Sequence, residues 1–175
     1  MNQEKWEKAV AFHGHSCPGL AIGFRAVEAA EKALGVSLFQ GTDEEVVCVA
    51  ENEACGIDAI MYLTDCTPGK GNFLFRLRGK QAFSFFIRDG KSVRVVLKPK
   101  SGEMTREEWQ EELLTKPVGE LFEVKKPHYE VPERARIFEN QLCATCGEST
   151  MELMLRIEEG KTLCLDCVKS YDRGF

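Results

Sequence analysis

The sequence predicts an α+β fold, in which helices of a larger N-terminal domain pack on a mostly antiparallel sheet and a small cysteine-rich module follows. Two observations indicate this. Apolar residues recur at helical spacing on both sides of three short β-rich segments within residues 72–99. Two C-x2-C pairs stand together after residue 142. At 175 residues, 43% of them hydrophobic, the chain can form one medium domain with its own core plus a small module.

The first two predicted helices flank the segment FHGHSC. Residues 3–11 have the pattern of a short amphipathic helix, which this segment ends. Pro18 then suits the first turn of a second helix, and apolar residues recur at helical spacing from Leu20 to Leu34 before Gly35. Cys17 is therefore expected at a helix N-terminus, where free backbone N–H groups favour a thiolate.

The remaining elements complete the predicted domain. Residues 44–52 indicate a buried strand and residues 53–66 a helix with Cys55 near its start. Three strands follow, with turns at Gly79-Lys80 and Asp89-Gly90, and residues 101–114 form a helix that Thr105 and Glu108 cap. We expect this domain to span residues 1–125, a strap to span 126–140, in which 134–138 could add a strand, and the small module to span 141–175.

The small module has the spacing of a four-cysteine zinc site. Cys143 and Cys146 form one C-x2-C turn and Cys164 and Cys167 form another, with seventeen residues between them. Each turn offers two thiolates on one side, so two turns complete a tetrahedron around Zn²⁺ and close it to water. We therefore predict a zinc-ribbon or treble-clef-like module with a structural zinc that supplies its folding energy. Residues 149–157, between the pairs, suit either a short helix or strands.

A second metal site is predicted where two helices begin. His15 and Cys17 precede one helix and Cys55 begins another, so convergence of the two starts would offer an imidazole and two thiolates to Zn²⁺ or another transition metal. Such a site keeps an open position, as metal-assisted chemistry or ligand binding requires. Asp58, one turn after Cys55, could orient a ligand or accept a proton, and Cys17 and Asp58 are the candidate catalytic residues. Alternatively, His13 and His15 are ordinary loop residues.

Other candidate residues have weaker patterns. Arg25 and Lys70 are expected to supply positive charge for an anionic ligand; the loop around Lys70, residues 66–72, lacks the frame of a nucleotide-binding loop. Cys66 is a further candidate metal ligand, whereas Cys48, in a predicted strand, is expected to be a small core residue.

Charge and hydropathy limit the function classes. A net charge of −5 argues against a bulk electrostatic contact with nucleic acid, although local clusters of positive charge leave that contact open. No apolar run reaches the length of a membrane span, and the N-terminus lacks the apolar region of a signal peptide. We therefore expect a cytoplasmic protein without a membrane partner, in which structural disulfides are disfavoured.

The segments FHGHSCPGLAIGFRA and ENEACGIDAIMYLTDCTPGKGN, followed by the paired C-x2-C tail, resemble the FmdE family of formylmethanofuran dehydrogenase proteins from about Phe12 to Cys167. The resemblance implies an α+β domain with a C-terminal zinc finger, and a homodimer. It also implies a metal or active-site cleft of His15, Cys17, Cys55 and Asp58, with Glu51 or Glu53, of which Glu51 fits the spacing better. The family is named for one component of a molybdenum or tungsten complex, but this chain has no pterin signature and no iron–sulfur cysteine run.

Three functions follow as expectations. The first is a protein with two metal sites that binds a small molecule or assists a molybdenum or tungsten enzyme as an accessory or cofactor- and metal-handling protein. The second is a binding module without catalysis, in which the zinc finger contacts protein or nucleic acid. The third is a thiol-based redox enzyme, which predicts a disulfide between Cys17 and Cys55 under mild oxidant.

Overall fold

The computed structural model describes residues 1–39, 43–88 and 90–169. The chain forms two compact units, Met1–Ala135 and Arg136–Phe175. The division falls within the segment 126–140, which the sequence predicts to be a strap. The 134–138 segment forms no strand. Among the described residues, no helix combines the length and apolar character needed to cross a membrane.

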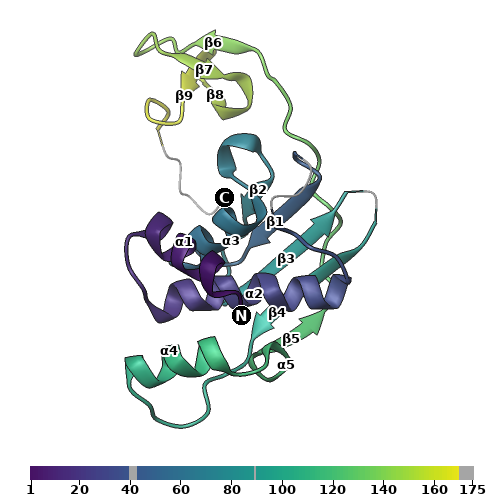
Figure 1. The fold of residues 1–175 in the computed structure, drawn as a ribbon. Helices are drawn as coiled ribbons and strands as arrows, with labels where there is room; N and C mark the ends of the chain where they lie inside the picture. The colour runs from purple at the N-terminus through teal and green to yellow at the C-terminus, as the bar shows by residue number, and fades with distance from the viewer. Residues whose placement is uncertain (40–42, 89, 170–175) are drawn as a thin grey trace. The chain divides into compact units, whose positions relative to one another are not determined.

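Unit 1 contains one five-stranded sheet with helices on one face (Figure 1). The strand order is β2-β1-β3-β4-β5, in which only the β1–β2 pair is parallel, so the predicted α+β class is confirmed. The strands are β1 (Val46–Ala50), β2 (Phe73–Phe75), β3 (Ala82–Ile87), β4 (Ser92–Leu97) and β5 (Phe122–Lys125). The helices are α1 (Gln3–His13), α2 (Pro18–Leu34), α3 (Gly56–Thr64), α4 (Arg106–Thr115) and α5 (Val118–Leu121), with a 3-10 turn η1 (Pro68–Lys70).

Several helix ends follow from local chemistry. The predicted capping box begins α4, where Thr105 Oγ1 accepts the N–H of Glu108 and the Glu108 carboxylate accepts the N–H of Thr105. Cys17 is the N-cap of α2, and its Sγ accepts the N–H of Leu20 at 3.3 Å. The β3–β4 hairpin forms as expected, although Asp89 of its predicted turn lies outside the described residues.

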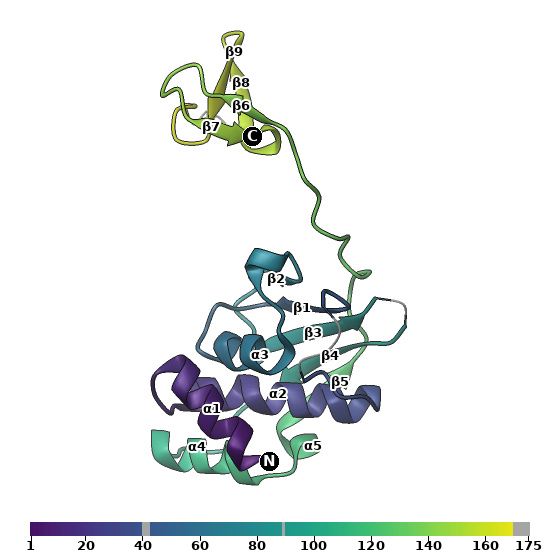
Figure 2. The same ribbon diagram turned by 45° about the horizontal axis from the view of Figure 1, so that its top comes forward.

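The two faces of the sheet are covered differently. Alternate side chains of the central strands, such as Cys48 and Phe85, enter the main core beneath the helices. Val47, Val49 and Phe86 point to the opposite face, where Tyr129 and Val131 of the strap pack on them. Figure 2 shows the helices gathered on the other side of the sheet from this segment. The strap therefore completes unit 1 as a covering layer.

Unit 2 has little core of its own. Two hairpins make up its regular structure, β6 (Asn140–Leu142) with β7 (Ser149–Met151) and β8 (Leu155–Glu158) with β9 (Lys161–Cys164), and a 3-10 turn η2 (Glu152–Met154) joins them. The segment 149–157, which suits either helix or strand by sequence, is thus mainly strand. The buried residues of unit 2 are Cys143, Leu163 and Cys164, too small a cluster to fold about 40 residues without further support.

Candidate metal centres

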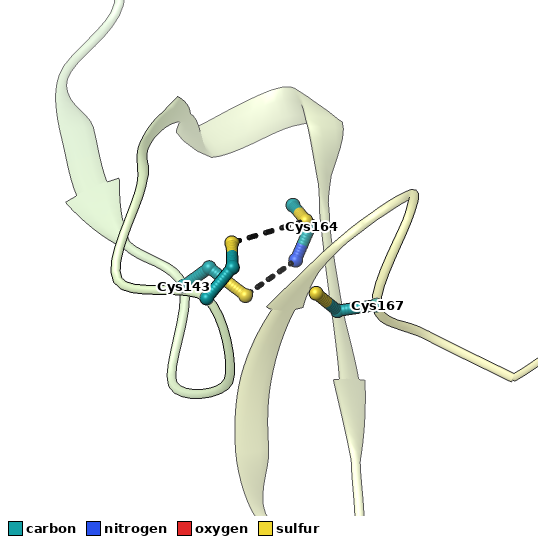
Figure 3. A group of neighbouring side chains, drawn as sticks. Cys143, Cys164 and Cys167 are labelled. Carbon is teal, nitrogen blue, oxygen red and sulfur yellow. Dashed lines mark hydrogen bonds between the residues drawn. The ribbon is translucent and has the colours of Figure 1, made fainter.

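The four cysteines of unit 2 converge. Their four Sγ atoms lie within 4.8 Å of one another. Cys143 and Cys146 come from the turn between β6 and β7, Cys164 ends β9, and Cys167 follows in the next turn. The side chains of Cys143, Cys164 and Cys167 point toward one another in Figure 3. Gly147, at φ +74°, allows the chain to turn back after the first pair, and its N–H donates to the carbonyl of Cys143.

Backbone N–H groups prepare this cluster for a cation. The N–H of Cys164 donates to Cys143 Sγ at 3.3 Å, and such backbone donors lower the pKa of Cys143 to about 6. The hydrogen bond with Cys164 raises the pKa of Cys167 to about 12. Without metal the cluster thus holds a thiolate beside protonated thiols, whereas Zn²⁺ requires thiolates. A set of four convergent thiols, one already ionised at neutral pH, fits a structural zinc ion.

A second group of potential ligands lies in unit 1 between α1 and α2. His13, at the end of α1, His15 and Cys17 each place a ligand atom within 4.8 Å of the others. The two imidazole rings lie 4.5 Å apart, and His13 Nε2 lies 3.8 Å from Cys17 Sγ. Gly14, at φ +92°, ends α1 and reverses the chain so that both histidines face the start of α2. Two imidazoles and a thiol are suitable ligands for Zn²⁺ and related ions.

Asp58 fixes one of these imidazoles from another element. Its Oδ2 lies 2.6 Å from His13 Nδ1, although the two residues are 45 positions apart in the chain. A carboxylate on one ring nitrogen orients the imidazole and leaves the other nitrogen free to bind a metal. The free nitrogen, Nε2, is the one that faces Cys17. Asp58 therefore occupies the supporting position expected from the sequence.

Cys55 lies beside this group without belonging to its closest three members. A Cβ atom placed on Gly19, in the first turn of α2, would lie 3.5 Å from Cys55 Sγ and 3.9 Å from Cys17 Sγ. Burial raises the pKa of Cys55, and the neighbouring Cys17 raises it further. Cys17 is buried and Cys55 exposed. The two predicted helix starts do converge, and Cys55 marks the side of the site that faces solvent.

Two close glycine contacts bring the helices together. A Cβ on Gly23 of α2 would lie 1.9 Å from the carbonyl oxygen of Gly56, the first residue of α3. A side chain at either position would push the helices apart, and with them Cys17 and Cys55. The small residues that follow each cysteine are thus part of the site's construction.

The sequence-based interpretation missed His13. The predicted helix stops at residue 11, whereas α1 continues to His13 and carries its ring toward Cys17. A usable signal was present, because His13 precedes Cys17 by four residues and Asp58 supplies a carboxylate for its second nitrogen.

Other predicted site residues have different surroundings. Arg25 is buried, two helical turns beyond Cys17, and bonds Glu28 and the carbonyl of Lys116, so its charge is already balanced and its predicted role in anion binding gains no support. Lys70 Nζ lies 3.3 Å from Asp43, and its ligand-binding role stays a prediction. Cys66 is fully buried and donates to the carbonyl of Val46; burial raises its pKa to about 11, and it lies outside both clusters.

Glu51, the carboxylate that the resemblance favoured for the cleft, is also committed elsewhere. Its two oxygens accept hydrogen bonds from Nε and a terminal nitrogen of Arg94 at 2.6 and 2.8 Å, and both side chains are buried. The arginine lowers the pKa of Glu51. Glu51 therefore stabilises unit 1 as half of a buried ion pair, and Glu53 is left as the exposed carboxylate of this segment.

The fold and the two ligand clusters define an α+β protein with candidate metal-binding groups in each unit. Residues 12–145 match the family described as FmdE, molybdenum formylmethanofuran dehydrogenase operon, and the chain belongs to this family. Residues 136–173 match the prokaryotic dksA/traR C4-type zinc finger, and the C-terminal unit is a zinc finger of this kind.

Two known proteins are similar over most of the chain. A crystal structure of an FmdE-like protein of tungsten formylmethanofuran dehydrogenase, from Syntrophus aciditrophicus, is 26% identical, with a TM-score of 0.68, over 94% of this chain and 90% of that one. A probable S-adenosyl-L-methionine-binding protein from Archaeoglobus fulgidus is 30% identical over 94% of this chain. The chain spans about half, 52%, of the length of that curated relative.

Proposed function

We propose that unit 1 binds a transition-metal ion in an open site and that the protein acts as an accessory or cofactor- and metal-handling protein of a molybdenum or tungsten formylmethanofuran dehydrogenase. The observation that carries the metal site is the convergence of His13, His15 and Cys17 within 4.8 Å, with Asp58 on the far nitrogen of His13. Three protein donors leave a coordination position free for a small molecule. Membership of the FmdE family supports the accessory role.

The residues divide into three tasks in this proposal. His13, His15 and Cys17 hold the ion, and Cys55 stands on the solvent side as an additional thiolate donor. Asp58 orients His13 and keeps its Nε2 available. The metal supplies Lewis acidity to a bound ligand. The zinc of the finger is closed to ligands by four thiolates and stabilises unit 2.

Metal analysis of two reciprocal variants tests the site. Protein purified without added metal is expected to hold about two transition-metal ions per chain, one for each donor set. His15→Ala/Cys17→Ser removes two donors of unit 1 and should leave about one ion, while Cys143→Ser/Cys146→Ser should lose the other ion only. Serine at position 17 keeps an oxygen acceptor for the α2 cap. A wild-type value near one ion that only the finger variant removes would reject the site in unit 1.

The accessory role needs a separate assay. Formylmethanofuran dehydrogenase complex purified without this protein would be assayed with wild-type protein and with His15→Ala/Cys17→Ser. The proposal expects wild-type protein to raise the activity or the metal content of the complex, and the variant to do so less. Equal effects of both proteins, or no effect of either, would contradict an accessory role that depends on the metal site.

A binding role of the zinc finger is a second candidate, supported by its exposed apolar side chains. Leu142, Ile157 and Leu165 are 69%, 80% and 50% exposed, an unusual share for so small a unit. Apolar exposure favours a protein partner over nucleic acid. This candidate predicts that the metal content of unit 1 is irrelevant, so the reciprocal variants distinguish it from the first.

A further inference from the structure

We propose that a cavity next to Cys55 binds a small organic cation with an apolar body, and that Glu53 contacts its positive charge. The cavity has a volume of about 330 Å³ and is lined by Asn52, Glu53, Ala54, Leu77, Gly79 and Gln81. This volume is in the range of small-molecule sites, which is about 300–1,000 Å³. As the ligand subsite of the metal centre, the cavity rests on the function proposed above; as a cation site, it stands on its own lining.

Hydrogen bonds already hold the two walls of the cavity together. Asn52 Nδ2 donates to the carbonyl of Lys80 at 2.8 Å, and Asn52 Oδ1 accepts the N–H of Ala54 at 3.1 Å. The N–H of Arg78 donates to the carbonyl of Glu51 at 2.8 Å. The segment before α3 is thereby tied to the segment between β2 and β3. A ligand enters preformed walls and has little backbone to order.

The cavity adjoins the solvent side of the metal centre. Its lining includes Ala54, and the next residue is Cys55, whose Cα is about 3.8 Å away along the chain. The side chain of Cys55 is exposed, whereas that of Cys17 is buried. A molecule held against Ala54 therefore lies within one residue of the only accessible thiol that we assign to the centre.

The lining selects the class of ligand. Leu77 is 49% exposed and offers, with Ala54, an apolar surface. Glu53 is exposed and makes no hydrogen bond or ion pair with any residue that the structure describes, so its carboxylate is available. Gln81 adds an amide to the lining. The cations of this segment, Arg78 and Lys80, are not part of the lining, so the cavity presents a negative charge and disfavours an anion.

A matched pair of fragments tests the charge. The full-length protein would be titrated with 4-methylbenzylamine, a cation at pH 7, and with 4-methylbenzyl alcohol, which has nearly the same shape and no charge. Backbone amide shifts of Ala54, Cys55 and Gln81 would report binding. We expect a Kd on the order of 1 mM for the amine and a weaker one for the alcohol. Glu53→Gln should weaken amine binding about fivefold and leave the alcohol unchanged.

Two control proteins isolate the cause. Glu103→Gln removes the same charge from an exposed residue outside the cavity and should bind the amine as the wild type does. His15→Ala/Cys17→Ser should also retain amine binding, because the lining is intact. Equal affinities for amine and alcohol, unchanged amine binding by Glu53→Gln, or shifts away from the cavity would each overturn the cation site. Loss of the metal from unit 1 with amine binding preserved separates a failure of the metal proposal from a failure of this one.

Discussion

Gly23 of α2 and Gly56 of α3 are in backbone contact, so that a Cβ on Gly23 would lie 1.9 Å from the carbonyl oxygen of Gly56. This contact sets how near the two helix starts can come, and each start carries a cysteine. The position of a metal ligand thus depends on residues that have no side chain at all.

Gly23→Ala should therefore damage both stability and the site. Backbone cannot yield as a flexible side chain can, and we expect a loss of about 2–3 kcal/mol in the free energy of unfolding, measured by urea denaturation. The metal of unit 1 should fall while the zinc of the finger is retained. Gly119→Ala is the control, because a Cβ there meets nothing within 4 Å. A Gly23→Ala protein with full stability would contradict the close packing of α2 on α3.

Asp58→Asn should weaken metal binding in unit 1 without unfolding it. The carboxylate holds His13 through Nδ1, and loss of such support costs about 10–100-fold in metal affinity. Competition with a chromophoric chelator measures the affinity. Asp65→Asn provides the same chemical change at the exposed end of α3, where asparagine tolerates the positive φ of 58°. Equal affinities of both variants would remove Asp58 from the site.

Glu51→Gln should destabilise unit 1 by about 3 kcal/mol at pH 7, because it leaves Arg94 buried without its carboxylate. The effect depends on pH. Since Arg94 lowers the pKa of Glu51, the pair contributes its full stability above the unfolded carboxyl pKa of about 4.3 and loses it as the pH falls through the lower, folded pKa.

The gap in unfolding free energy between wild type and Glu51→Gln should accordingly narrow on acidification below about pH 4.3. Denaturant titrations across this range measure it. Glu123→Gln disrupts the exposed pair with Lys125 and should change stability by less than about 0.5 kcal/mol. A gap that stays constant with pH would show that Glu51 does not titrate with a lowered pKa.

Removal of zinc should unfold unit 2 and spare unit 1. The small apolar cluster of the finger cannot fold it alone, and binding requires protons to leave the thiols of Cys146 and Cys167, whose pKa values are raised. Zinc affinity should therefore fall as the pH is lowered. Amide spectra recorded with increasing EDTA would show the loss of dispersion in residues 140–164 only. Dispersion that survives chelation would contradict a structural role of the metal.

Oxidation distinguishes a metal centre from a thiol redox pair. Metal held by Cys17 should protect it from forming a disulfide with Cys55, so that oxidised glutathione yields this disulfide only after chelation. Each disulfide formed consumes two thiols and reduces one glutathione disulfide to two glutathiones. Mass spectrometry of non-reduced peptides reads the product. Rapid formation in metal-loaded protein would favour the redox alternative.

Much of the fold could be predicted because its signals are local. Pro18 after Cys17, the Thr105–Glu108 capping box and the C-x2-C pairs each identify a structure over a few residues, and all three are confirmed. The mixed α+β class followed from them. The strand β5 was missed, since residues 122–125 pair with β4 only in three dimensions and have no strong strand pattern of their own.

The site was harder to predict than the fold, because distant residues complete it. His13 has a partner 45 residues away, and the contact of Gly23 with Gly56 appears only when the helices pack. Arg25 and Glu51 looked available in the sequence because nothing local indicates that each is buried beside an opposite charge. Charged residues near a motif are therefore uncertain candidates until their burial is known.

Cys17 has one further consequence, for evolution, because one atom caps α2 and also serves as a proposed ligand. A serine hydroxyl can accept the same N–H but is a poor donor to a soft metal. Exchange of a single sulfur for oxygen would keep the architecture and abolish the chemistry. Relatives with serine here are expected to form a lineage that inherits the shape without the metal.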